Sequence, residues 1–339
     1  MFRDILRKVA AGGVLARQEA LEAGRSLASG NTEPVAAAAF LGALAARGET
    51  AEEIAGLAMA FRESMKPFPP APNAVDTCGT GGDNRATFNL STAAALTTAS
   101  LGQHVAKHGN RGVSSACGSA DLLESLGYPI AEDPAEAAAR YTEHRFAFLF
   151  APKYHPAMAH MSAVRRTMGV RTAFNLLGPL LNPAGVRRQV VGVFSRECMS
   201  LVAGCMEMLG CERAMIVHAD GGYDEVILSA PTHVIELRNG RRDQYDLGHD
   251  DFGLPAGRRE DVLGGDATHN AAQLEALLRG HADRGLCRAV AANAALALRI
   301  AGRCEGLKEA AGVALDAIES GEVGRFFDAL LERQDARLS

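Results

Sequence analysis

Two short glycine-rich segments in the first third of the sequence contain the residue types that bind phosphate groups. The first is Gly79-Thr80-Gly81-Gly82-Asp83, and the second is Lys107-His108-Gly109-Asn110-Arg111. Glycine has no Cβ, so backbone N–H groups can approach an anion, and Lys107 and Arg111 add full positive charges. A single segment of this kind is more often a tight turn between a strand and a helix. Two such segments, the second with two cations, favour a polyphosphate site.

Polar side chains around these segments add hydrogen-bond donors at the starts of two expected helices. We expect one helix from Ser91, as its N-cap, to Leu101, and a second from Ser119, as its N-cap, to Gly127. Unpaired N–H groups at such helix starts favour an anion. Neither the Gly-x-Gly-x-x-Gly dinucleotide motif nor the nucleoside triphosphate P-loop motif is present. The candidate side-chain donors are Asn89, Ser91, Thr92, Ser114, Ser115 and Ser119.

Two adjacent carboxylates later in the chain are candidates for a metal site. Asp224 and Glu225 follow an expected strand that ends at His218. Adjacent carboxylates on a loop are most often a solvated turn, and composition leaves that interpretation open. Facing a diphosphate, however, they would repel it unless a cation lay between them. Mg²⁺ is the expected cation, because it binds one or two carboxylates together with phosphate oxygens and water.

Arginines and histidines near the middle of the chain allow more than one interpretation. Arg165, Arg166 and Arg171 follow an expected strand on a helical pattern, which a solvated helix face would explain, and this is the preferred interpretation for Arg166. His155 is best interpreted as a structural histidine. His108 lies inside the second glycine-rich segment, which favours a place in the site. A guanidinium can bind a carboxylate with two parallel hydrogen bonds, so an arginine here can orient an acidic substrate.

The residues 79–83, the run Asn89-Leu90-Ser91-Thr92 and the residues 107–111, in this order and spacing, resemble the anthranilate phosphoribosyltransferase family. The resemblance extends over essentially the whole chain. It implies transfer of the 5-phosphoribosyl group from phosphoribosyl diphosphate (PRPP) to the amine of anthranilate. The products would be N-(5-phosphoribosyl)anthranilate and diphosphate, in the second step of tryptophan biosynthesis from chorismate. The resemblance also implies Mg²⁺ as a cofactor and a homodimer formed through a small helical domain.

The same resemblance implies roles for individual residues. Lys107 and Arg111 would stabilise the departing diphosphate as catalytic residues, and Arg165 would bind the carboxylate of anthranilate, with Gly79 and Asn110 beside it. The implied metal ligands are Ser91, Asp224 and Glu225. The implied PRPP-binding residues are Gly79, Gly82, Asp83, Thr87, Asn89, Ser91, Thr92, Lys107, His108, Gly109, Asn110, Arg111, Ser114, Ser115 and Ser119.

The chain departs from the family beside these motifs. Asn84-Arg85 follow Asp83 where a glycine is common, and Ala116-Cys117-Gly118 replace a usual Lys-Ser-Gly. These departures bear on the affinity for PRPP more than on the type of reaction. Two alternatives remain: an enzyme similar to the pyrimidine nucleoside phosphorylases, which share the fold but lack the Gly-Thr-Gly-Gly-Asp form, and a non-catalytic relative that binds nucleic acid.

The composition narrows the class of protein. The chain has 339 residues, of which 47% are hydrophobic and 22% are charged, as in ordinary globular proteins. A net charge of −5 argues against general nucleic-acid binding. The seven cysteines include no Cys-x-x-Cys pair, which favours reduced thiols. No apolar run reaches membrane-spanning length and no signal peptide is recognisable, so we expect no membrane association and a cytoplasmic location.

The pattern of apolar residues predicts a small helical domain followed by a large α/β domain. Residues up to about 66 contain only helical patterns, including a capping box at Thr50 and Glu53, and the proline-rich segment 67–72 marks the boundary. We therefore expect a helical domain over 1–70, joined by helices around 160–185, and a catalytic domain over 71–339. Short apolar strands alternate with helices after residue 75, which predicts a mainly parallel central sheet. The tail from His269 to about Leu331 is again helical.

Overall fold

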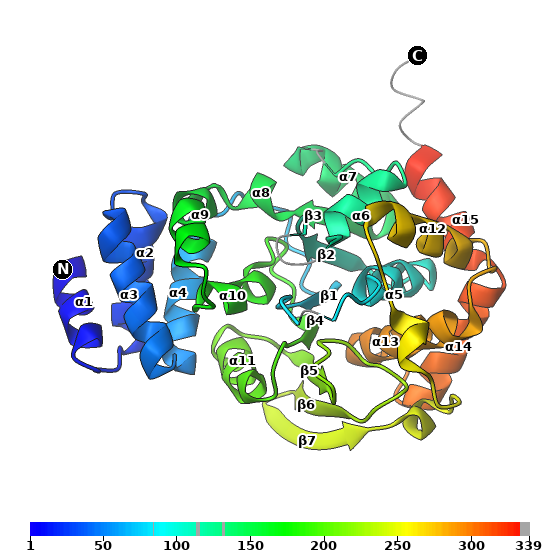
Figure 1. Ribbon diagram of the computed structural model, residues 1–339. Helices are drawn as coiled ribbons and strands as arrows, with labels where there is room; N and C mark the ends of the chain where they lie inside the picture. Colours follow the sequence, from blue (N-terminus) through cyan, green and yellow to red (C-terminus); the bar gives the residue numbers. More distant parts are fainter. Residues whose placement is uncertain (84, 113–115, 131–132, 333–339) are drawn as a thin grey trace, which may run out of the picture.

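The computed structural model describes residues 1–83, 85–112, 116–130 and 133–332, and it has a helical lobe beside an α/β lobe (Figure 1). Two later helices share the hydrophobic core of the first four, so the helical lobe is built from two separate parts of the chain. The helices of this lobe are α1 Phe2–Ala10, α2 Arg17–Ala28, α3 Pro34–Arg47, α4 Ala51–Glu63, α9 Pro156–Met168 and α10 Phe174–Leu177.

The start of α4 confirms the predicted capping box. The Glu53 backbone N–H donates to the Thr50 hydroxyl at 3.3 Å, and the Thr50 N–H donates to Glu53 Oε2 at 2.9 Å. The Glu53 side chain is also fully buried, where it accepts a hydrogen bond from the Leu15 N–H and pairs with Arg47 at 2.5 Å. The cap therefore also holds the helices of this lobe together.

Within the described ranges, seven strands form one sheet in the order β3-β2-β1-β4-β5-β6-β7, and the first five in this order are parallel. Strands β6 and β7 join antiparallel at one edge. The expected helical domain plus mainly parallel α/β domain is confirmed. The strands are β1 Val75–Gly79, β2 Val105–Gly109, β3 Phe146–Phe150, β4 Arg188–Gly192, β5 Arg213–Ala219, β6 Thr232–Arg238 and β7 Arg241–Leu247.

Helices cover both faces of the sheet. One face packs against α5 Leu90–Ser100, α6 Ser119–Ser125, α12 Ala267–Leu278, α13 Arg284–Ala301, α14 Leu307–Glu319 and α15 Glu322–Leu331. The other face packs against α7 Pro134–His144, α8 Ala151–Tyr154, α11 Glu197–Met208 and the helical lobe. Short 3₁₀ helices span Gly178–Leu181, His249–Phe252 and Arg259–Val262.

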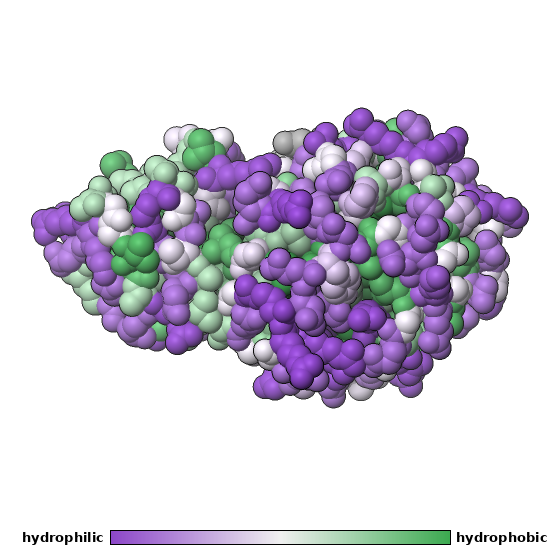
Figure 2. Space-filling model, turned by 90° about the horizontal axis from the view of Figure 1, so that it is seen from below, coloured by the Kyte–Doolittle hydropathy of each residue, from purple (hydrophilic) through white to green (hydrophobic). Residues whose placement is uncertain are grey.

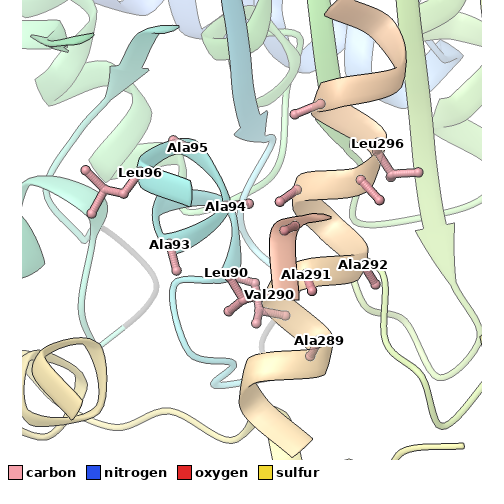
Figure 3. Packing of buried hydrophobic residues seen from close by; sticks show 14 of the residues in the cluster. Leu90, Ala93, Ala94, Ala95, Leu96, Ala289, Val290, Ala291, Ala292 and Leu296 are labelled. Carbon is pink, nitrogen blue, oxygen red and sulfur yellow. The ribbon is translucent and has the colours of Figure 1, made fainter. Parts of the chain in front are cut away.

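The close approach of α5 and α13 fixes the position of the segment just before α5. Figure 3 shows the alanines of α5 beside those of α13, and the labelled side chains are buried. Small side chains let the two helix backbones come close without a void. Because α5 begins directly after residue 89, this packing holds the polar residues 89–92 at the carboxyl ends of β1 and β2.

Two predicted N-caps are wrong by one or two residues. The N-cap of α5 is Asn89, so Ser91 lies in the first turn, and the N-cap of α6 is Gly118, so Ser119 is its first helical residue. The Ser91 N–H is instead paired with a carboxylate from a distant loop. A sequence pattern that considers only neighbours along the chain cannot detect such a partner.

Strand β7 was not predicted, because its residues are mostly charged. Arg241, Arg242, Asp243 and Gln244 are exposed along this edge strand, and Figure 2 shows strongly hydrophilic side chains on this lower face of the α/β lobe. Charged residues on an edge strand discourage pairing with other chains. Among the described residues, no helix is both long and apolar enough to cross a membrane.

Candidate active site

Three carboxylates meet near the carboxyl ends of the parallel strands. Asp224 and Glu225 follow the turn after β5, and Asp83 ends the first glycine-rich segment. Burial, and then the negative charge of Asp83, raises the pKa of Asp224 to about 7. Burial, and then the charge of Asp224, raises the pKa of Glu225 well above its ordinary value. Asp83 Oδ2 and Glu225 Oε2 have no hydrogen-bond partner among the described residues, so the cluster favours a cation.

This cluster fits a hydrated magnesium ion better than a metal that needs a complete set of protein ligands. No group of three or more His, Cys, Asp or Glu side chains in the described ranges is close enough to hold a metal ion alone. Mg²⁺ needs only one or two carboxylates and keeps several water or phosphate ligands. The Ser91 N–H donates to Glu225 Oε1 at 2.9 Å, so the structure brings Ser91 beside the two expected carboxylate ligands.

Two glycines let the carboxylate loop approach the sheet. At Gly192, the last residue of β4, any Cβ would collide with the backbone carbonyl of Asp224. At Gly79, the last residue of β1, a Cβ would lie 2.7 Å from Asp224 Oδ2. The sequence analysis missed Gly192, and its signal was a glycine at the end of an apolar strand, which often marks a close backbone approach.

Lys107 lies beneath this cluster rather than on its surface. Its side chain in β2 is buried, and Nζ donates to the Thr77 carbonyl oxygen at 2.5 Å and to Ser91 Oγ at 3.4 Å. Burial lowers the pKa of Lys107, while the charges of Asp76, Cys78 and Glu225 oppose that change. The ammonium group therefore supports the base of the site from within the protein.

The second glycine-rich segment packs against the start of α6. The Asn110 carbonyl oxygen accepts hydrogen bonds from the Ala120 N–H at 3.1 Å and from Ser119 Oγ at 3.3 Å. Arg111 is half exposed and pairs with Asp121 at 3.0 Å and with Glu124 at 2.6 Å. In this conformation its charge is directed toward α6. The remaining predicted residues Ser114 and Ser115, and the atypical Asn84, lie outside the described residues.

Residues from two other parts of the chain hold the Asn89 side chain in place. The Asn89 amide donates to the Cys117 carbonyl oxygen at 3.1 Å, and Asn89 Oδ1 accepts from Asn270 Nδ2 at 3.0 Å. Thr87 forms an isolated antiparallel bridge with Leu263. Nothing in the local sequence around residue 270 indicated this contact, which the sequence analysis missed. The predicted residue Thr92 is fully buried, and its hydroxyl has no hydrogen-bond partner within the described part of the chain.

Two buried histidines form a neutral pair on the side of the site next to the helical lobe. His108 Nε2 and His155 Nε2 are 3.1 Å apart. Burial, and then the neighbouring His155, lowers the pKa of His108 to about 3, and burial lowers the pKa of His155 to about 4. His108 Nδ1 lies 3.2 Å from the Gly178 carbonyl oxygen and so carries a proton, which makes His155 Nε2–H the donor to His108. The pair contributes polarity without charge near neutral pH.

The three arginines singled out in the sequence lie in different surroundings. The Arg165 guanidinium lies 5.5 Å from the centre of the Phe174 ring, and burial lowers its pKa. No carboxylate in the described residues pairs with it. Arg171 donates to the Gly82 carbonyl oxygen and lies 4.0 Å from the centre of the Phe194 ring, so it supports the first glycine-rich segment. Arg166 is exposed, as expected for a solvated helix face.

This fold and this site together define a glycosyltransferase with a helical-bundle domain and an α/β domain. Residues 3–65 match the glycosyl transferase family, helical bundle domain, and residues 71–323 match the glycosyl transferase family, a/b domain. The matched regions place the carboxylate cluster, both glycine-rich segments and the histidine pair in the α/β domain.

Comparison with individual proteins narrows this class. The anthranilate phosphoribosyltransferase of Rubrobacter xylanophilus is 44% identical over 322 residues, which cover 95% of this chain and 94% of the relative. The crystal structure of the anthranilate phosphoribosyltransferase from Thermus thermophilus has a TM-score of 0.92 and 42% identity, covering 97% of this chain and 98% of that one. The chain belongs to the anthranilate phosphoribosyltransferase family, which confirms the resemblance and the predicted enzyme class.

Structures of the anthranilate phosphoribosyltransferase from Saccharomyces cerevisiae include ligands. A complex with PRPP and Mg has a TM-score of 0.88 and 26% identity, covering 98% of this chain and 97% of that one. A complex with 4-fluoroanthranilate has a TM-score of 0.87 and 26% identity, covering 98% and 96%. Neither the phosphorylase nor the nucleic-acid-binding alternative is favoured by these comparisons.

Proposed function

We propose that this chain transfers the 5-phosphoribosyl group of PRPP to the amine of anthranilate, with release of diphosphate, as the second step of tryptophan biosynthesis from chorismate. The observation that carries the proposal is the group formed by Asp83, Asp224 and Glu225 beside two glycine-rich segments. Its partly uncompensated negative charge suits a cation that a diphosphate would share.

PRPP is proposed to bind across the carboxyl ends of β1 and β2. The yeast relative was crystallised with PRPP and Mg, which supports the same donor and metal here. Backbone N–H groups near Gly79 to Asp83 and at the start of α5 would donate hydrogen bonds to the phosphate oxygens. The residues proposed to bind PRPP are Gly79, Gly82, Asp83, Thr87, Asn89, Ser91, Thr92, Lys107, His108, Gly109, Asn110, Arg111, Ser114, Ser115 and Ser119.

Ser91, Asp224 and Glu225 are proposed to hold Mg²⁺. When bound, the ion would neutralise negative charge on the diphosphate oxygens. Lys107 adds positive charge from beneath, because it donates to Ser91 Oγ and to the Thr77 carbonyl oxygen. Arg111 would contribute by exchanging its partners on α6 for the diphosphate.

Anthranilate is proposed to bind between the second glycine-rich segment and α9. Arg165 has a charge without a carboxylate partner among the described residues, and it would bind the anthranilate carboxylate, with Gly79 and Asn110 beside the ring. The 4-fluoroanthranilate complex of the yeast relative supports this substrate class. An aromatic amine is neutral at pH 7, so the reaction depends mainly on orientation and on stabilising the leaving group.

The assembly and the domain limits remain proposals. We propose a homodimer through the helical lobe, where α3 exposes Val35 at 82% together with Ala39 and Ala46, and Figure 2 shows pale and green side chains among the hydrophilic ones at the end of this lobe. The domains are proposed to be 1–70, with the helices at 160–185 added to it, and 71–339. A cytoplasmic location also remains a prediction.

The decay of anthranilate fluorescence tests the proposed function. The decay should require both PRPP and Mg²⁺ and should stop in EDTA. The double variant with Asp224→Ala and Glu225→Ala should lose the Mg²⁺-dependent turnover. A folded wild-type protein that causes no decay at high concentration would refute the proposal, and release of a base from a pyrimidine nucleoside in phosphate would then favour the phosphorylase alternative.

A further inference from the structure

His233, on β6, lies between two carboxylates of the edge of the sheet. Its Nδ1 is 2.6 Å from Asp246 Oδ1 on β7, and its Nε2 is 2.8 Å from Asp220 Oδ1 after β5. Ionised carboxylate oxygens accept hydrogen bonds and cannot donate them. Both ring nitrogens must therefore donate, which requires the doubly protonated imidazolium form. The geometry identifies His233 as a cation with two anionic partners.

The groups around His233 favour the same charge state. Burial alone lowers the pKa of His233, but the hydrogen bonds to Asp246 and Asp220 outweigh burial and raise the pKa above the ordinary histidine value. Arg196, which precedes α11, opposes this increase. His218 is the residue opposite His233 on β5, and its Nδ1 is engaged with a backbone carbonyl oxygen.

The carboxylate held by His233 begins the turn that carries the proposed metal ligands. The Asp220 N–H donates to the Pro231 carbonyl oxygen at 2.9 Å, which fixes the backbone at the end of β5. The Ala219 carbonyl oxygen accepts hydrogen bonds from Gly222 and Tyr223, and the Ala219 N–H donates to the Tyr223 carbonyl oxygen. This closed turn leads directly to residues 224 and 225.

We propose that His233 is a positioning residue for the transfer reaction. Its imidazolium ties Asp220 to the edge of the sheet and thereby orients the turn that presents Asp224 and Glu225 to Mg²⁺. The catalytic consequence of this inference rests on the proposed function. The charged tether, meaning the contacts of His233 with Asp220 and Asp246, does not depend on that function. Nothing in the family's glycine-rich motifs involves β6 or β7, so this device lies outside the site described above.

The tether depends on pH with a definite sign. A histidine whose pKa is raised in the folded protein stabilises it fully below the ordinary histidine value, and this contribution is lost as the pH rises through the raised pKa. Loss of the proton leaves one of the two carboxylates without a donor. Alkaline pH should therefore loosen the turn and raise the Mg²⁺ requirement.

The charge state of His233 can be measured without turnover. ¹⁵N NMR of the ring nitrogens, assigned by the signals missing in His233→Gln, should show both nitrogens protonated at pH 7 and a titration above the ordinary histidine value. Asp246→Asn should lower the midpoint of the His233 titration. A neutral His233 ring at pH 7 would overturn the inference.

The positioning role is measured by the Mg²⁺ concentration that gives half-maximal turnover. His233→Gln should raise it about tenfold at pH 7, the lower end for partners outside a metal's direct ligands. The kcat at saturating Mg²⁺ should change much less. His233→Arg stays charged, so at alkaline pH it should keep the Mg²⁺ requirement that the wild type shows at pH 7. The matched control His249→Gln, beside exposed Asp250, should leave the requirement unchanged.

A further variant separates this inference from protein instability and from the proposed function. Asp220→Asn changes a half-exposed side chain and should raise the Mg²⁺ requirement as His233→Gln does. If both variants fold and keep the wild-type Mg²⁺ requirement, the positioning role is wrong while the proposed function stands. If wild-type protein shows no turnover, the proposed function fails, and the NMR titration still decides whether the tether exists.

Discussion

Replacing Asp224 by asparagine should stabilise the metal-free protein while removing its activity. Burial and the charge of Asp83 raise the pKa of Asp224 from 3.8 to about 7. At about 1.4 kcal/mol for each pH unit, the ionised carboxylate destabilises the folded state by about 4 kcal/mol above pH 7. Asparagine has nearly the same shape and no charge, so Asp224→Asn removes this cost.

The sign of the pH dependence follows from the direction of the shift. Because the folded-state pKa is raised, the stability associated with protonated Asp224 is complete below 3.8 and is lost as the pH rises through about 7. The stability difference between Asp224→Asn and wild type should therefore grow by about 3 kcal/mol between pH 5 and pH 8. Wild-type protein should respond to added Mg²⁺ by stabilisation at pH 8 and much less at pH 5.

Thermal unfolding in EDTA measures this effect. At about 2 °C for each kcal/mol, the variant should melt about 8 °C above wild type at pH 8. Mg²⁺ should raise the Tm of wild type but not that of the variant, and turnover should be lost. Asp250→Asn, at a side chain that is 93% exposed, is the matched control and should change neither quantity. A variant that is no more stable than wild type, or a Tm difference that does not change with pH, would show that Asp224 carries no uncompensated charge in the folded protein.

Three further variants test other parts of the structure. Arg165→Ala should raise KM for anthranilate about a hundredfold with a much smaller change in kcat, because a charged hydrogen-bonded contact contributes about 2–3 kcal/mol; steady-state kinetics at saturating PRPP measure this. Gly192→Ala should abolish turnover, since its methyl group would collide with the carboxylate loop, whereas Gly312→Ala, with open space around the same atom, should keep it. Glu53→Gln should lower the free energy of unfolding by about 3–5 kcal/mol in urea titrations, because Arg47 loses its buried partner.

Each of these variants has an outcome that contradicts its reasoning. An Arg165→Ala enzyme altered only in its KM for PRPP would place anthranilate elsewhere. Equal activities of Gly192→Ala and Gly312→Ala would mean that the loop can move without loss of the site. A Glu53→Gln protein as stable as wild type would show that the capping box, rather than the ion pair, holds the start of α4.

Local sequence patterns predicted the elements of this fold, but not the contacts between them. The capping box at Thr50 is visible because its signal lies within a few neighbouring residues. Strand β7 was missed because an exposed edge strand rich in charge lacks the alternation that identifies other strands. Its place in the sheet comes from pairing with β6, a contact that appears only in three dimensions.

The site shows the same division at the level of single residues. The glycine-rich segments were found because they are contiguous, and the family resemblance favoured a metal site over a solvated turn at the adjacent carboxylates Asp224 and Glu225. Asn270 reaches Asn89 from far along the chain, and Glu225 accepts a hydrogen bond from the N–H of Ser91, which the sequence had predicted as the helix N-cap. Such partners carry no signature at either position, because any polar residue at the right place could fill the role.

Lys107 explains how this arrangement of carboxylates is stable enough to exist in the folded chain. Burial raises the pKa of both Asp76 and Glu225, and the positive charge of Lys107 opposes that larger effect at each carboxyl group. Burial, and then the charge of Asp83, raises the pKa of Asp224 to about 7, and one buried lysine leaves an excess of negative charge when Asp76, Asp83, Asp224 and Glu225 ionise together. That excess is what a divalent cation would neutralise. The buried lysine therefore stabilises the cluster of carboxyl groups, but it leaves the cluster with too little positive charge until a cation binds.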